Sequence, residues 1–196
     1  MVAKQMISLS SQGLQRLGVC LLLVLVVVAV VVVRGSSLPV AANKIDQDLL
    51  EPGDILFVDI YDGWSQGGYW DHMAVYSEDP FPGVVEATFT AGVSYTELPV
   101  FLERDWPAKV AVKRLKDIPD REEIIQRAVE YALAQVGRPF DYTAAATLPL
   151  KINEKNLHCS ELVWRAYKAA GIDLDSNGGL LVYPDDIYFS PKLELP

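Results

Sequence analysis

Residues 72–88 read HMAVYSEDPFPGVVEAT, and this stretch has the pattern of a β-hairpin. Two runs rich in Val, Ala and other apolar residues, 72–76 and 84–88, flank a turn that contains Pro80, Pro82 and Gly83. Proline and glycine interrupt strands, because proline cannot donate to the ladder and glycine tolerates the backbone angles of a turn. A connection this short joins neighbouring strands, so we expect the two runs to pair antiparallel.

Similar runs lie on both sides of this hairpin along the chain. Each is rich in Val, Ile, Phe or Tyr and is bounded by Gly, Pro or Asp, which predicts further strands at 54–60, 93–98 and 109–115. Short connections between successive strands again indicate antiparallel pairing.

The second half of the chain has the apolar spacing of amphipathic helices. We expect helices over 121–136 and 159–170, each followed by a glycine that can end it, Gly137 and Gly171. Strands first and helices after predict an α+β domain over residues 53–196, with an antiparallel sheet of about five strands packed on helices.

A charge-free apolar run precedes this domain at 17–33, between Arg16 and Arg34. As a helix rising about 1.5 Å per residue, it would span roughly 25 Å, near the lower limit for crossing a bilayer. We therefore divide the N-terminal part into a flank (1–16), a transmembrane or signal-anchor helix (17–34) and a linker (35–52).

The fate of this segment depends on whether it is cleaved. Small residues at 40–42 offer a processing site near Ala42, and cleavage there would release a secreted domain. The apolar run exceeds the roughly 7–15 residues of a signal core, and Arg34 follows at once, which favours a permanent anchor. Basic residues flank the run on both sides, so charge alone does not fix the orientation. We expect a membrane-anchored domain outside the cytoplasm.

The domain itself is strongly acidic. Three of the 17 basic residues (Lys4, Arg16 and Arg34) and none of the 26 acidic ones precede residue 44, which leaves 14 basic and 26 acidic residues, a net charge of −12. Nucleic-acid phosphates repel such a domain, so we expect no nucleic-acid partner.

Cys159 is the single cysteine outside the apolar run, which contains Cys20. It opens the helix predicted at 159–170. The free N–H groups and dipole of a helix start lower the pKa of a thiol and can hold an oxyanion. This position alone fits either a small buried residue or a nucleophile.

The chain has two histidines that could act as a base for this thiol. His72 begins a strand, whose backbone pairing fixes the direction of the imidazole. His158 directly precedes Cys159, and adjacent side chains at a helix start point in different directions. We therefore favour His72 as the base, with His158 lining the site or capping the helix. Glu86 would share a sheet face with His72 if the turn holds an odd number of residues, which the sequence leaves open.

These features are similar to those of a known family. The chain resembles the permuted papain-like amidases of the YaeF/YiiX type, in the branch of the NlpC-type cysteine peptidase superfamily where His precedes Cys. The resemblance covers roughly residues 50–190 and rests on five motifs in order: GDILF (53–57), HMAVY (72–76), VEA (85–87), GRPFDY (137–142) and CSELV (159–163).

The resemblance implies roles for three residues: Cys159 as nucleophile, His72 as base and Glu86 as the group that orients the imidazole. It also implies hydrolysis of amides or esters, with peptidoglycan peptides or acylated molecules as substrates. We therefore expect a thiol-dependent amidase or peptidase that cleaves an amide bond in a cell-envelope peptide through a thioacyl intermediate.

Two positions depart from the family pattern. Phe140 stands where a Tyr hydroxyl commonly helps to bind the oxyanion, and we expect Tyr142 or His158 to line the site there. Asp71 replaces a small residue before His72, and its charge would raise the pKa of that imidazole. Trp70, in the Gly-rich stretch 62–71, either forms one wall of the cleft or packs on the core.

We expect neither a metal nor another cofactor, because His72, His158 and Cys159 lack the CxxC or HxxxH spacing of metal sites. Two other functions stay open. One is a lipid-directed thiol acyltransferase or esterase, since lecithin:retinol acyltransferase-like proteins also place His before Cys. The other is a membrane-tethered binding module with a degenerate site, which Phe140 favours.

Overall fold

The computed structural model describes residues 45–60, 68–104, 109–142, 151 and 155–196. The chain divides into two units at residue 40, and every described residue belongs to the second unit, 41–196. The predicted transmembrane or signal-anchor helix at 17–34, with its flank 1–16, lies outside the described residues. Among the residues that are described, no helix has the length and apolarity to cross a membrane.

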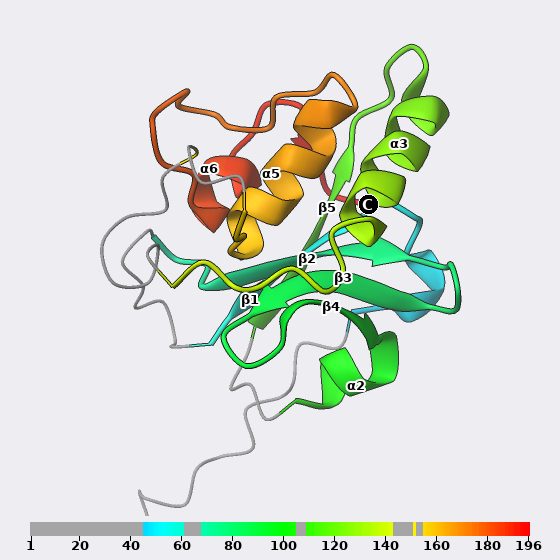
Figure 1. The fold of residues 1–196 in the computed structure, drawn as a ribbon. Helices are drawn as coiled ribbons and strands as arrows, with labels where there is room; N and C mark the ends of the chain where they lie inside the picture. The colour runs from blue at the N-terminus through cyan, green and yellow to red at the C-terminus, as the bar shows by residue number, and fades with distance from the viewer. Residues whose placement is uncertain (1–44, 61–67, 105–108, 143–150, 152–154) are drawn as a thin grey trace, which may run out of the picture. The chain divides into compact units, whose positions relative to one another are not determined.

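The described residues form an α+β domain around a six-stranded antiparallel sheet, with strand order β4-β3-β2-β1-β5-β6 (Figure 1). The predicted hairpin is confirmed as β2 and β3, which pair antiparallel. All five predicted strands are present, and a short sixth strand near the C-terminus was not predicted. The strands are β1 (Ile55–Asp59), β2 (His72–Ser77), β3 (Gly83–Thr88), β4 (Gly92–Glu97), β5 (Lys109–Leu115) and β6 (Leu193–Glu194).

Helices cover both faces of this sheet. Three lie on one face, α3 (Arg121–Leu133), α5 (Cys159–Ala169) and α6 (Pro184–Tyr188), and α2 (Leu98–Glu103) lies on the other (Figure 1). A 3₁₀ turn, η1 (Gln47–Leu49), precedes the first strand.

Two helix boundaries differ from the sequence prediction for local reasons. The helix predicted over 121–136 ends at Leu133, because the N–H groups of Gln135 and Val136 bond three residues back and tighten the last turn. Leu98, predicted as the end of a strand, instead begins α2. Pro99 follows it, and proline suits the first turn of a helix but cannot donate to a sheet ladder.

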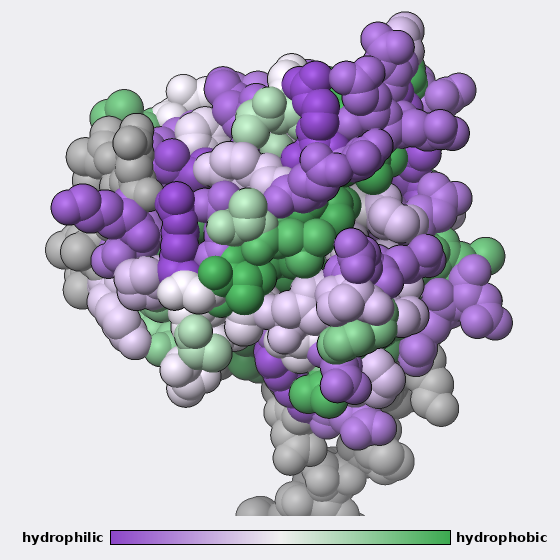
Figure 2. Space-filling view, turned by 45° about the vertical axis from the view of Figure 1, so that its right-hand side comes forward, coloured by the Kyte–Doolittle hydropathy of each residue, from purple (hydrophilic) through white to green (hydrophobic). Residues whose placement is uncertain are grey.

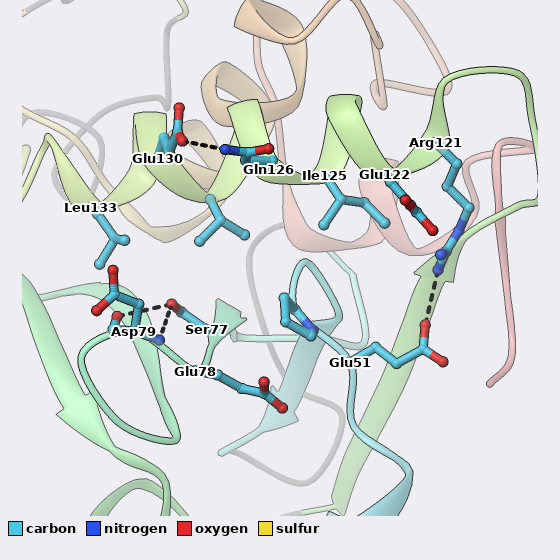
Figure 3. A pocket seen from close by; sticks show the side chains of 12 residues that line it. Glu51, Ser77, Glu78, Asp79, Arg121, Glu122, Ile125, Gln126, Glu130 and Leu133 are labelled. Carbon is cyan, nitrogen blue, oxygen red and sulfur yellow. Dashed lines mark hydrogen bonds and ion pairs between the residues drawn. The ribbon is translucent and has the colours of Figure 1, made fainter.

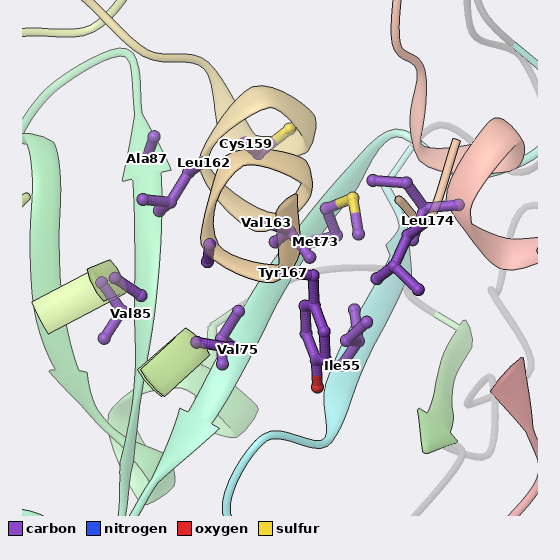
Figure 4. Packing of buried hydrophobic residues seen from close by; sticks show 14 of the residues in the cluster. Ile55, Met73, Val75, Val85, Ala87, Cys159, Leu162, Val163, Tyr167 and Leu174 are labelled. Atoms are coloured by element: carbon purple, nitrogen blue, oxygen red, sulfur yellow. The ribbon is translucent and has the colours of Figure 1, made fainter. Parts of the chain in front are cut away.

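Alternation along the strands divides the apolar residues between two cores. Side chains such as Ile55, Met73 and Val75 pack against Leu162 and Tyr167 of α5 (Figure 4). On the opposite face, residues that include Leu56, Ala74 and Val84 pack against Leu98 and Phe101 of α2. The sheet is therefore buried on both faces, as its largely apolar strands require.

Gly53 brings the start of β1 close to α3. Its φ is +85°, and a Cβ built there would lie 2.7 Å from Cγ2 of Ile125, so a side chain would meet both strain and a clash. The hydroxyl of Tyr167 donates to the Gly53 carbonyl. In the next residue, both carboxylate oxygens of Asp54 accept hydrogen bonds from Arg114, at 2.8 and 2.7 Å.

Candidate active site

Cys159 is the first residue of α5, is 8% exposed and is not in a disulfide. Two sets of contacts fix this helix start. Leu157 donates to the carbonyl of Pro139 at 3.2 Å and accepts from the N–H of Asp141 at 3.1 Å, which holds the chain before the cysteine against residues 139–141. Ser160 Oγ donates to the carbonyl of Val182 at 2.6 Å.

His72 and Glu86 are brought together by the register of β2 and β3. Ala74 lies opposite Glu86, and five residues, 78–82, separate the strands, so the turn has the odd length that places His72 and Glu86 on one face. His72 Nε2 lies 2.9 Å from Glu86 Oε2, and both side chains are buried.

The thiol approaches from the other side of the sheet. Cys159 packs with the core of α5, whereas the His72 ring lies 6.4 Å from that of Phe101 in α2. Because His72 is the first residue of β2, it stands at the end of the sheet, where a group from the opposite face can reach it. The Cys159 and His72 side chains interact, and each shifts the pKa of the other. With Nε2 directed at Glu86, Nδ1 of His72 is left for the thiol.

Glu86 is held by two further residues that sequence reasoning missed. Arg104 donates to its two oxygens at 2.8 and 2.6 Å, and Thr96 Oγ1 donates to Oε1 at 2.6 Å. Burial opposes ionisation of Glu86, but the hydrogen bonds from His72 and Arg104 outweigh it and lower its pKa to about 2. Arg104 follows a six-residue helix and has no motif of its own, so no sequence signal marks it.

The pKa values of the thiol and imidazole shift in opposite directions. Burial favours the neutral form of each, but their mutual interaction is stronger. The hydrogen bonds to Cys159 and Glu86 raise the pKa of His72 to about 9 despite its burial. Burial would raise the pKa of Cys159, but hydrogen bonds with His158 and His72 lower it to about 5. Between these values the site holds a thiolate beside an imidazolium.

His158 is the N-cap of α5, one of the two roles expected from the sequence. Its Nδ1 accepts the backbone N–H of Ser160 at 3.2 Å, which satisfies one free donor of the helix start. Because Nδ1 accepts that bond, the neutral ring carries its proton on Nε2, a buried atom that bonds to no nitrogen or oxygen within the described part of the chain. The ring also reaches Cys159, although adjacent side chains were expected to diverge.

Three other candidate residues from the sequence bond to or pack on groups other than Cys159 and His72. The Tyr142 side chain is exposed, and its hydroxyl donates to the carbonyl of Phe89 at 2.6 Å. Asp71 accepts the N–H of Ile60 at 2.9 Å, and its expected effect on the pKa of His72 stays a prediction.

Trp70 takes the second of its two expected roles and packs on the core. It is 6% exposed, and its ring centroid lies 6.0 Å from that of Phe57 and 5.0 Å from that of Tyr188. Asp185 anchors this part of the chain, since its carboxylate accepts the N–H groups of Tyr69 and Trp70 at 3.0 and 2.8 Å.

Comparison with known proteins bears on the family and the fold of the chain. A family model of permuted papain-like amidases of the YaeF/YiiX type, the C92 family, matches residues 49–181. The chain belongs to this family. Membership confirms the resemblance drawn from the sequence motifs, and together with the sheet and its helices it confirms a papain-like α+β fold. It also assigns the chain to a family of papain-like amidases and peptidases.

Two similar proteins extend the comparison. The uncharacterised protein YycO of Bacillus subtilis (strain 168) is 40% identical over 67 residues, which cover 31% of this chain and 24% of YycO. The chain therefore matches about a quarter of that relative. A crystal structure of YiiX from Escherichia coli O157:H7, described as a metalloprotein, matches with a TM-score of 0.59. The YiiX sequence is 18% identical to this one. The match covers 74% of this chain and 96% of the YiiX chain, and it shows that the two share a fold.

YiiX is described as a metalloprotein, which raises the question whether this chain holds a donor set for a metal ion. Within the described ranges, no three side chains of His, Cys, Asp or Glu gather as a bound ion would need.

Proposed function

We propose that this permuted papain-like amidase hydrolyses an amide bond with Cys159 as nucleophile, His72 as acid and base, and Glu86 as the group that orients the imidazole. One observation carries the proposal: Nε2 of His72 lies 2.9 Å from Glu86 Oε2, and the same imidazole interacts with the thiol of Cys159. A nucleophile, a base and a third group that holds the base are the arrangement that thiol acyl transfer requires.

The reaction begins from the thiolate–imidazolium pair. The Cys159 thiolate attacks the carbonyl carbon of the substrate, and the carbonyl oxygen becomes an oxyanion. When the tetrahedral intermediate collapses, the C–N bond breaks and the imidazolium of His72 gives its proton to the leaving amine. The thioester that remains is attacked by water, which neutral His72 deprotonates. The acid is released, and the proton on His72 re-forms the ion pair.

Two N–H groups are available to stabilise the oxyanion. The backbone N–H of Cys159 lies at the start of α5 and, among the described residues, makes no hydrogen bond. We assign the second donor to His158, whose Nε2 proton bonds to no nitrogen or oxygen in the same residues and whose ring interacts with Cys159. These donors would take the place of the family's Tyr hydroxyl, which Phe140 lacks. Removing one such donor typically costs about 10²–10³ in rate.

We further propose a cell-envelope peptide as the substrate and a membrane-anchored location outside the cytoplasm. The support is the apolar segment at 17–34 and the substrate class implied by the family resemblance. A hydrolase tethered in this way would act on bonds near the membrane surface.

The test incubates the full chain with peptidoglycan fragments and, separately, with acyl-lipids in water enriched in ¹⁸O, followed by mass spectrometry. Hydrolysis of a cross-bridge or stem peptide adds one ¹⁸O to the new carboxylate, and the Cys159→Ala variant leaves the peptide intact. Deacylated lipid with uncut peptide would replace the peptide substrate by a lipid. Equal cleavage by the wild type and Cys159→Ala would overturn the thiol mechanism.

A further inference from the structure

A groove of about 610 Å³ lies at the other end of β2 from His72 (Figure 3). Between His72 and Ser77 the strand rises by about 3.3 Å per residue, which separates the groove from the imidazole by roughly 17 Å along the strand. One wall comes from α3 and the other from residues 77–79 after β2, with residues 51–52 at one end. None of the proposed catalytic residues lines it.

The floor of the groove is apolar. Ile125, Val129 and Leu133 follow one another at four-residue spacing along α3 and face the groove together, with Pro52 beside them. The space-filling view shows a strip of hydrophobic surface between hydrophilic side chains (Figure 2). Such a floor can bury an apolar side chain of a ligand, at about 25 cal/mol for each Å² removed from water.

The rim of the groove is acidic. Five exposed carboxylates line it: Glu51, Glu78, Asp79, Glu122 and Glu130. Arg121 is the single basic residue of the lining. Its guanidinium already bonds to Glu51 at 3.2 Å and to the carbonyl of Leu115.

Most of these carboxylates keep their negative charge. Glu51 pairs with Arg114 at 2.9 Å, whereas Glu130 accepts only from the neutral amide of Gln126 at 2.9 Å. Within the part of the chain that the structure describes, Glu78, Asp79 and Glu122 form no ion pair. They stand on both walls, Glu122 on α3 and the other two after β2. A ligand that lies along the floor therefore has negative charge on either side.

We propose that this groove binds a short peptide segment of a protein partner in which Lys or Arg residues flank Leu or Val side chains. The apolar side chains would cover the floor formed by α3, and the cations would pair with Glu78, Asp79 and Glu122. An acyl chain is the poorer occupant, because hydrocarbon beside these carboxylates removes water from them and supplies no counter-charge. Acidic peptides and nucleic acids are repelled.

The test measures the affinity of the full chain for a fluorescein-labelled peptide, Lys-Leu-Leu-Lys-Leu-Leu-Lys, and for its counterpart with Glu in place of Lys. We expect the lysine peptide to bind, to weaken as salt rises from 50 to 300 mM, and to exceed the glutamate peptide by at least tenfold. The paired reversal Glu78→Lys with Glu122→Lys should raise its Kd at least tenfold. The matched reversal Asp48→Lys with Asp117→Lys, at exposed acids outside the groove, should change it less than threefold.

A second variant guards against loss of folding in the double reversal. Gln126→Arg adds a cation at an exposed position of α3 between Glu122 and Glu130, and we expect it to weaken the lysine peptide at least threefold. The proposal is overturned if the lysine peptide does not bind below millimolar concentration. It is overturned equally if both pairs of reversals weaken binding alike, which would mean that the acidic surface as a whole, not the groove, attracts the peptide.

Discussion

Strand β2 begins at His72, whose charge is enclosed by the Cys159 thiolate and Glu86, and it ends at Ser77, after which Glu78 and Asp79 stand in water. At the first end, every charge removed from water has a partner within hydrogen-bond distance. At the second end, carboxylates stay without cations because water solvates them. Burial therefore requires pairing where the chemistry occurs, while exposure leaves charge available for a ligand.

The largest effect should come from breaking the pair at the first end. We expect His72→Ala to lower kcat/KM about 10⁴-fold, because the thiolate loses its counter-charge and the leaving group loses its acid. Iodoacetamide labelling of Cys159 measures the same loss without a substrate. We expect the labelling midpoint near pH 5 in the wild type, and it should move upward towards that of an ordinary thiol when the imidazolium is absent.

The sign of the pH profile follows from the two shifted groups. The pair is ionised above the lowered pKa of Cys159 and below the raised pKa of His72, so activity should rise near pH 5 and fall near pH 9. The control is Asp79→Ala, from the other end of β2, which should leave both the profile and the labelling within twofold of the wild type. An unchanged labelling midpoint in His72→Ala would show that the pair is not formed.

The next effect separates two roles of His158. Asn is a good N-cap and can accept the N–H of Ser160 as the imidazole does, but it lacks the ring N–H on Nε2. We therefore expect His158→Asn to keep its thermal midpoint within a few degrees and to lower kcat about 10²-fold. Full activity in this variant would reduce His158 to a helix cap.

We expect a smaller effect on the free energy of unfolding, which again differs between the two ends of β2. Arg104→Met leaves the carboxylate of Glu86, which is fully buried, without its bidentate partner, and should cost about 1–3 kcal/mol at pH 7 in urea denaturation. Glu122→Met at the groove should stay within about 0.5 kcal/mol, since its carboxylate is exposed.

The pH dependence of that loss has a defined sign. The pKa of Glu86 is lowered in the folded protein, so its stabilisation is present above the unfolded value of 4.5 and is lost as the pH falls towards about 2. Without Arg104 the pKa of Glu86 rises, and protonation removes the unpaired charge at a higher pH. The difference between Arg104→Met and the wild type should therefore shrink at pH 3. A loss that is equal at both pH values would mean that packing, not charge, explains it.

Sequence patterns predicted the helices and strands well, because the spacing of apolar residues and the positions of Pro and Gly are local properties of the chain. The hairpin of residues 72–88 shows this, since Pro80 and Gly83 mark its turn and the apolar runs its strands. The two-residue strand β6 was missed, because Leu193 and Glu194 carry no periodic signal and pair with β5 only in the folded chain.

The residues of the candidate site differ in how far the sequence alone could identify them. Cys159 and His72 could be identified because cysteine and histidine are rare in this chain and each stands at the start of a helix or strand. Glu86 needed the register, which depends on the number of residues that the turn leaves unpaired. Arg104 and Thr96 could not be found, because their role exists only through contacts with Glu86 across segments that lie 10 to 18 residues apart.

Tyr142 provides the smallest expected effect and the closest contrast with His158. The sequence offered both as groups that line the oxyanion site, one through a hydroxyl and the other through an imidazole. The hydroxyl of Tyr142 already donates to Phe89, and its side chain is 59% exposed, whereas Nε2 of His158 is buried and bonds to no nitrogen or oxygen among the described residues. We therefore expect Tyr142→Phe to change kcat less than about threefold, since a neutral exposed hydrogen bond contributes only about 0.5–1.5 kcal/mol to stability and none to the intermediate. Side-by-side kcat measurements of Tyr142→Phe and His158→Asn decide the assignment. If the Tyr142 variant loses 10²-fold and the His158 variant little, the hydroxyl must leave Phe89 during turnover and the oxyanion donor belongs to the GRPFDY segment rather than to the cap of α5.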